Sequence, residues 1–140
     1  AGDAALLQDY FKYRTYHGAA MPLPTQHASI QAWRDEKHVI ENRRLYREKF
    51  AAVNGILSGI PSLSIPPAGF YLWMQTPIDD TLFTQKLFAN ENVTVLPGSY
   101  LSRDFGGINP GRNHIRIALV APLEECIEAA QRLKNFFNTL

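Results

Sequence analysis

The first 60 residues carry apolar side chains at the spacing of three and four that is typical of amphipathic helices. Asp3 is a suitable N-cap for a first helix that runs to about residue 16. Thr25 starts a second helix, and a long third helix is predicted over roughly residues 35–57. Glycine and proline residues, which break helices, fall between and after these segments: Gly18, Pro22, Pro24, Gly59 and Pro61.

After residue 62 the spacing changes to that of short strands separated by helices. Residues 70–75 are apolar on both faces, which predicts a central strand. Residues 93–96 and 114–121 predict two further strands, and a glycine-rich loop over 102–113 precedes the last of them. This order predicts an α/β fold in which helices pack on a short sheet.

Two helices are predicted among these strands. The first is capped by Asp79 or Asp80 and runs to about residue 90. The second closes the chain, and Pro122 fits its first turn because a missing N–H donor costs nothing there. The side chains expected to face the core from these helices are Leu82, Phe83, Leu87, Phe88, Ile127, Ala130, Leu133 and Phe137.

The last predicted strand contains an arginine. Alternation places His114, Arg116, Ala118 and Val120 on one face, opposite a face of aliphatic residues. A guanidinium in a strand cannot lose its charge, and its planar fork suits bidentate capture of a carboxylate or a phosphate. Two interpretations follow: an internal salt bridge to an acidic residue, or an anionic ligand.

Composition excludes several classes of protein. Apolar residues make up 46% of the 140 residues, which is typical of a globular chain with a core. The net charge is +1 and the basic residues are scattered, so we expect no binding to nucleic acid. No apolar run reaches the roughly 18 residues of a membrane span, and the amino end does not resemble a signal peptide.

Cysteine and histidine usage adds two expectations. The single cysteine, Cys126, excludes an internal disulfide, suits a reducing cytoplasm and lies on the apolar side of a helix, so we expect a buried, unreactive thiol. The histidines lack the spacing of metal ligands, and no metal site is predicted.

Five stretches of the sequence carry a resemblance to known proteins: residues 13–18, 42–50, 67–74, 93–101 and 109–121. They resemble the carboxyl-terminal region of fold-type-I pyridoxal-phosphate aminotransferases. The resemblance covers essentially the whole chain in order, and within the family it is strongest to the N-succinyldiaminopimelate aminotransferases of bacterial lysine biosynthesis.

The resemblance implies roles for particular segments. Residues 1–34 would be the tail of the large cofactor-binding domain, and residues 35–140 would be the connecting helix and the small domain. Arg116 matches the arginine that binds the substrate α-carboxylate, which favours the ligand interpretation. His17 matches a region that packs near the partner subunit's active site in a homodimer, where it is a weak candidate for a cofactor contact; a loop histidine with no such role is the alternative. The implied substrates are amino acids and 2-oxo acids, with pyridoxal phosphate as cofactor.

The family's Schiff-base lysine has no counterpart here. Its aspartate for the pyridine nitrogen and its phosphate-binding turn are also missing, so we expect a fragment of an enzyme that alone is inactive and holds no cofactor covalently. A non-catalytic binding or assembly module that kept this part of the fold is the alternative. The lysines, none of which lies in the expected motif, are Lys12, Lys37, Lys49, Lys86 and Lys134.

Other residues permit a functional and a structural interpretation. The aromatic side chains of Phe70, Tyr71 and Trp73 suggest a binding platform, but core packing is the favoured interpretation. Asn113 is adjacent to the arginine strand, where a turn role is favoured over a ligand contact.

Overall fold

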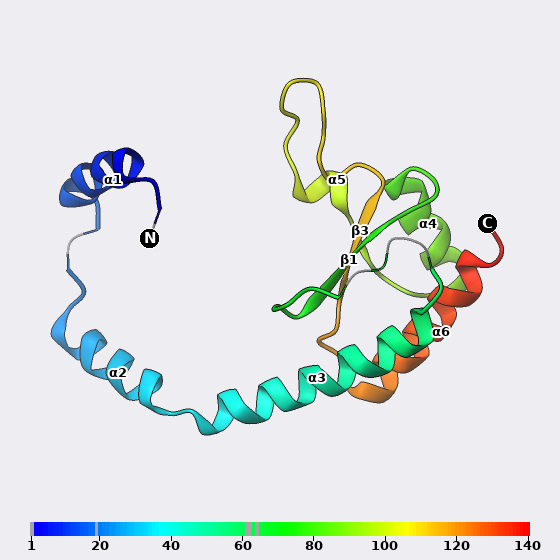
Figure 1. Ribbon diagram of the computed structural model, residues 1–140, viewed down its shortest axis with the longest axis horizontal. Helices are drawn as coiled ribbons and strands as arrows, with labels where there is room; N and C mark the ends of the chain where they lie inside the picture. The colour runs from blue at the N-terminus through cyan, green and yellow to red at the C-terminus, as the bar shows by residue number, and fades with distance from the viewer. Residues whose placement is uncertain (1, 19, 61–62, 64) are drawn as a thin grey trace. The chain divides into compact units, whose positions relative to one another are not determined.

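The computed structural model describes residues 2–18, 20–60, 63 and 65–140. The chain forms two compact units, Ala1–Glu41 and Asn42–Leu140 (Figure 1). The boundary between these units falls inside a long helix, α3 (Lys37–Leu57). The predicted division of the chain into the tail of one domain and a second domain stays a prediction.

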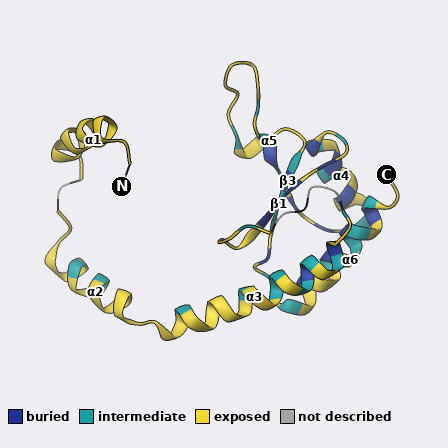
Figure 2. Cartoon of the chain, viewed as in Figure 1, coloured by how far each residue is buried: buried dark blue, intermediate teal, exposed yellow. Residues whose placement is uncertain are grey.

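The first unit contains the helices α1 (Ala4–Tyr16) and α2 (Leu23–Arg34). Asp3 caps α1 as predicted, since its Oδ1 accepts hydrogen bonds from the backbone N–H groups of Ala5 at 3.0 Å and Leu6 at 3.1 Å. Helix α2 begins two residues before Thr25, because a proline is tolerated in the first helical turn. Neither helix contains a buried residue (Figure 2).

The second unit contains an antiparallel sheet of three described strands, β1 (Tyr71–Gln75), β2 (Leu96–Pro97) and β3 (His114–Ala118). Their order is β1-β3-β2, so the arginine strand is central and β1 is an edge strand. The prediction that residues 70–75 form a central strand is therefore wrong. The strand predicted over 93–96 is also shifted, since only Leu96 and Pro97 pair with β3.

Three helices accompany the sheet: α4 (Asp80–Glu91), α5 (Gly98–Leu101) and α6 (Leu123–Phe137). Asp79 caps α4, with Oδ1 accepting from the N–H groups of Thr81 at 3.0 Å and Leu82 at 3.1 Å. The short helix α5 precedes the loop predicted over 102–113, in a segment for which the sequence analysis predicted no element. Pro122 is the N-cap of α6 and does not lie in its first turn.

The core of the second unit lies between one face of the sheet and the helices α3, α4 and α6 (Figures 1 and 2). The short sheet packed with helices is confirmed. Part of the predicted helix phase was wrong: Leu82, Phe88 and Ile127 are exposed, whereas Phe136, which was not expected to face the core, is buried. The buried apolar residues are Val53, Leu57, Leu72, Met74, Phe83, Leu87, Val93, Val95, Ile115, Leu119, Cys126, Ala130, Leu133 and Phe136. Among the described helices, none is long and apolar enough to cross a membrane.

Candidate substrate-binding site

Arg116 lies in the middle of β3, the central strand. Its cross-strand partners are Trp73 on β1 and Leu96 on β2. Residues directly opposite each other in an antiparallel pair share a face, so these three side chains share the face that points away from the core. Ile115, which alternates with Arg116, is fully buried on the other face. The predicted assignment of faces in this strand is confirmed.

The guanidinium of Arg116 is half-buried and lies over an aromatic ring. Its Cζ is 5.6 Å from the centre of the Tyr71 ring, within the range of a cation–π contact. Its Nε is buried and lacks a hydrogen-bond partner among the described residues. No ion pair between the described residues includes Arg116; the pairs of His38 with Asp35, Arg44 with Glu48 and Arg132 with Glu128 lie elsewhere. The described chain thus offers an unpaired cation on an open sheet face, as an anion-binding site requires.

The aromatic residues of β1 border Arg116. Phe70 and Tyr71 are exposed and Trp73 is half-buried, so the interpretation of these residues as core is wrong. The physical reason is the alternation of the strand, which gives the core-facing positions to Leu72 and Met74. The ring of Trp73 stacks on that of His114, with centroids 5.5 Å apart and planes at 12°.

A buried carboxylate holds the backbone next to this face. Asp80, at the start of α4, is 0% exposed. Its Oδ2 accepts the backbone N–H of Ser99 at 2.9 Å, and its Oδ1 accepts that of Asn113 at 3.1 Å. Burial favours the neutral acid, but the hydrogen bonds from Ser99 and Asn113 outweigh it and hold the pKa of Asp80 below its ordinary value. The sequence analysis considered Asp80 only as a possible helix cap. Since Asp79 caps the helix, the presence of a second aspartate directly after it was the sequence signal that Asp80 has another role.

The same two segments approach each other through glycines. A Cβ added to Gly98 would lie 2.4 Å from the carbonyl oxygen of Gly111, and one added to Gly111 would lie 2.0 Å from that of Gly98. Between them, Asn109 donates from Nδ2 to the Ser99 carbonyl at 3.2 Å and accepts the Gly111 N–H at 2.9 Å. We call this contact of residues 98–99 with residues 109–113 the glycine junction.

The other predicted site residues lie elsewhere. Asn113 adopts a left-handed conformation (φ +57°) before β3, so its turn role is confirmed. His17 belongs to the first unit, where its ring stacks on Tyr13 at 4.7 Å, and its suggested role at the cofactor stays a prediction.

Lys49 of α3 donates to the carbonyls of Leu119 at 3.2 Å and Val120 at 3.4 Å. The described residues contain no cluster of three or more histidine, cysteine or acidic side chains that could hold a metal ion.

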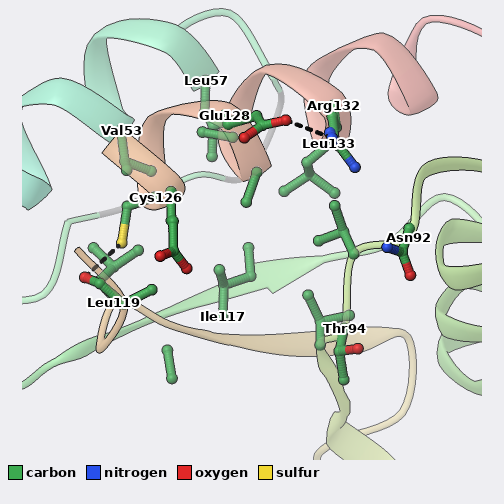
Figure 3. Close-up of a pocket in the computed structure, with 17 residues that line it drawn as sticks. Val53, Leu57, Asn92, Thr94, Ile117, Leu119, Cys126, Glu128, Arg132 and Leu133 are labelled. Carbon is green, nitrogen blue, oxygen red and sulfur yellow. Dashed lines mark hydrogen bonds and ion pairs between the residues drawn. The ribbon is translucent and has the colours of Figure 1, made fainter. Parts of the chain in front are cut away.

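A cavity of about 300 Å³ lies on the core side of the sheet (Figure 3). Val53, Leu57 and Ile117 line it together with the thiol of Cys126, whose Sγ donates to the Ala121 carbonyl. The expectation of a buried cysteine is confirmed. This burial raises the pKa of the thiol; the charge of Lys49 opposes the rise and that of Glu125 adds to it. Arg116 does not line this cavity, which is therefore separate from the candidate site.

Comparison with known proteins gives the candidate site a context. A crystal structure of an aminotransferase from Neisseria meningitidis is 48% identical over 98% of this chain and 35% of its own, with a TM-score of 0.80. The chain is similar to aminotransferases. A probable aminotransferase of Mycobacterium tuberculosis is 29% identical over 94% of this chain and 30% of its own length. No protein-family model matches.

A third relative is a probable N-succinyldiaminopimelate aminotransferase from Thermus thermophilus. It is 36% identical over 74% of this chain and 27% of that chain, with a TM-score of 0.60. Aminotransferase relatives thus cover nearly all of this chain, and its mixed fold matches the corresponding part of their structures. The chain spans about a third of the length of the curated relatives it matches.

Proposed function

We propose that this chain is the carboxyl-terminal part of a longer pyridoxal-phosphate aminotransferase in which Arg116 binds the α-carboxylate of the substrate. The observation that carries the proposal is the half-buried Arg116, which has no acidic partner among the described residues and lies on the open face of the sheet. The chain is similar to aminotransferases, which act on molecules with an α-carboxylate. A carboxylate is an anion whose two oxygens match the planar fork of a guanidinium.

The arginine would bind and orient the substrate. The guanidinium carbon of Arg116 lies over the Tyr71 ring, and its buried Nε has no hydrogen-bond partner among the described residues, so the planar fork can donate to a carboxylate. Two parallel hydrogen bonds fix the direction of the carboxylate and therefore that of the neighbouring Cα–H bond. The same contact serves the amino acid and the oxo acid, because both carry the α-carboxylate.

We expect this chain alone not to hold the cofactor covalently, because the family's Schiff-base lysine has no counterpart among its lysines. Pyridoxal phosphate acts as an electron sink when it is held through a lysine, but Lys49, in the second unit, is engaged with backbone carbonyls. Lys86 and Lys134 lie on α4 and α6, helices that pack on the core side. In our proposal the rest of the longer enzyme holds the cofactor, and this chain alone is inactive.

The proposed reaction is transfer of the amino group of N-succinyl-L,L-diaminopimelate to 2-oxoglutarate, in cytoplasmic lysine biosynthesis. The relative from Thermus thermophilus with that name supports this choice of substrate. The proposed assembly is a homodimer, with His17 near the partner's cofactor.

The test is Arg116→Lys in the full-length protein that contains this chain. Lysine keeps the charge but loses the bidentate geometry, so kcat/KM for the amino acid and for the oxo acid should fall about tenfold to a thousandfold, from about 1.5–3 kcal/mol for a charged hydrogen bond. Cofactor absorbance should not change. Normal kinetics with a lower melting temperature would instead mean that Arg116 has only a structural role.

A non-catalytic binding or assembly module that keeps this part of the fold is the second candidate. The encoding gene separates the two. A reading frame that continues upstream into a Schiff-base lysine segment supports the enzyme, whereas a start codon near Ala1 supports the module.

A further inference from the structure

We propose that Asp80 is a positioning residue for substrate binding, acting through the glycine junction to fix the place of Arg116. The inference rests on the proposed function, since it concerns how the carboxylate-binding arginine is held. Asp80 does not lie on the face of Arg116; it contacts the backbone of the segments that lead to it.

All three strands of the described sheet are tied to this carboxylate. Ser99, whose N–H binds Oδ2, follows β2 by two residues. Asn113, whose N–H binds Oδ1, immediately precedes β3. The carbonyl of Asn113 in turn accepts the N–H of Thr76 at 2.8 Å, and Thr76 directly follows β1. One buried side chain therefore holds the backbone at the carboxyl end of β2 and the amino end of β3, and it is linked through Asn113 to the carboxyl end of β1.

Arg116 is close to these ties along the chain. It lies three residues after Asn113 on β3, and its partner on β2, Leu96, lies three residues before Ser99. A change in the spacing of β2 and β3 at the junction would therefore displace the guanidinium relative to the remainder of the site. A displacement of about 1 Å in a positioning group can cost about a hundredfold in rate.

The junction requires a charged acceptor of this shape. Both hydrogen bonds come from backbone N–H donors, so each oxygen of Asp80 must accept. Ionised aspartate has two acceptor oxygens, whereas asparagine has one and would direct an N–H₂ group at a second donor. The backbones at Gly98 and Gly111 are already in close contact, since a Cβ atom added at either glycine would collide with backbone. The two segments therefore cannot move closer together.

The test compares Asp80→Asn with Arg116→Lys and with the double variant in the full-length enzyme. Asp80→Asn should raise KM for both the amino acid and the oxo acid about tenfold, with a smaller change in kcat and unchanged cofactor absorbance. Because Asp80 acts through Arg116, the double variant should have a KM within about twofold of that of Arg116→Lys. If the increase in KM of the double variant is instead the product of the increases in the two single variants, the inference is overturned.

Two further variants make the result specific. Leu87→Ala creates a cavity in the same helix two turns away, so it should lower the melting temperature and leave KM unchanged. Asn109→Ala removes the other side-chain link across the junction and should raise KM in the same direction by a smaller factor. It also provides the test if Asp80→Asn does not fold, and a normal KM in Asn109→Ala would then overturn the inference.

The arms of the experiment separate the two hypotheses. If Arg116→Lys has normal kinetics, the proposed function fails and the positioning role fails with it. If Arg116→Lys raises KM while Asp80→Asn lowers only the melting temperature, the proposed function stands and the positioning role is overturned.

Discussion

The two units of this chain differ in how their helices are stabilised. In Ala1–Glu41, Phe11 is 75% exposed, Trp33 is 81% exposed and neither α1 nor α2 has a buried residue. In Asn42–Leu140, Phe83 is 0% exposed and packs edge-on against Phe136 at 5.1 Å. Apolar spacing predicted helices in both units. It identifies the face that a helix can bury, but it does not identify the surface that covers that face.

The difference has a thermodynamic consequence. Isolated helices of about 12–15 residues are marginally stable in water, and tertiary packing supplies most of the stability of helices in proteins. Helices α1 and α2 have 13 and 12 residues and no core of their own among the described residues. In the proposed longer enzyme, their apolar side chains would pack against the remainder of the large domain.

The largest expected effect comes from matched phenylalanine truncations in the two units. Phe83→Ala should lower the free energy of unfolding by about 3–5 kcal/mol, because it leaves a cavity beside Phe136 and Phe137. Phe11→Ala in this 140-residue chain should change it by less than about 0.5 kcal/mol, because an exposed ring loses little on truncation. Urea unfolding monitored by circular dichroism measures both. Equal losses would show that the first unit has a core.

The sequence predicted the elements of the fold better than their pairing. Helix bounds depend on local signals such as the Asp3 and Asp79 caps, and these were identified correctly or to within two residues. Strand order depends on contacts between distant residues, so β1 was assigned to the centre of the sheet, which β3 occupies. Pro97 lies one residue beyond the strand predicted over 93–96 but belongs to β2, because an edge position does not require its missing N–H.

A smaller effect is expected on acid stability, and it should be confined to the second unit. The pKa of Asp80 is below its ordinary value of 3.8 in the folded protein, so the unfolded chain binds the proton first as pH falls. The stability that Asp80 contributes is therefore fully present above pH 3.8 and is lost as pH falls below it. The difference in unfolding free energy between the wild type and Asp80→Asn should be constant near neutral pH and shrink below pH 3.8.

The two tryptophans assign this acid effect to a unit. Trp73 lies on β1 and Trp33 on α2, so Trp33→Phe leaves a fluorophore only in the second unit and Trp73→Phe leaves one only in the first. Unfolding followed by Trp73 should show the pH-dependent difference. A difference that is unchanged down to pH 2.5 would contradict the assigned role of the Asp80 hydrogen bonds.

The candidate site was predicted in part, and the missing part has a physical reason. Arg116 was found because a cation in an apolar strand is a local anomaly, visible in one stretch of sequence. Asp80 is 33 positions from Asn113, and its role is set by backbone N–H groups whose positions depend on the fold. No pattern of side chains in the sequence reports such a contact.

The smallest expected effect concerns a thiol in each unit. Cys126 is 5% exposed and burial raises its pKa, so at neutral pH it should react with a disulfide reagent at least about a hundredfold more slowly than an exposed thiol. The matched control is Ala32→Cys in the Cys126→Ala background, which places the thiol on an exposed position of α2. Equal rates would show that the second unit opens as readily as the first.

The close approach of Gly98 and Gly111 limits how the substrate range of such an enzyme could be changed by directed evolution. Any larger residue at either position would collide with the backbone of the facing segment, so most members of a randomised library there would be lost before selection for activity. Tyr71 is exposed and lies beside Arg116, so we expect it to accept a wider choice of side chain, whereas the ring of Trp73 packs close to Gly98. Diversity introduced at Tyr71, with both glycines and Trp73 kept, would alter the surroundings of the arginine while leaving its support intact.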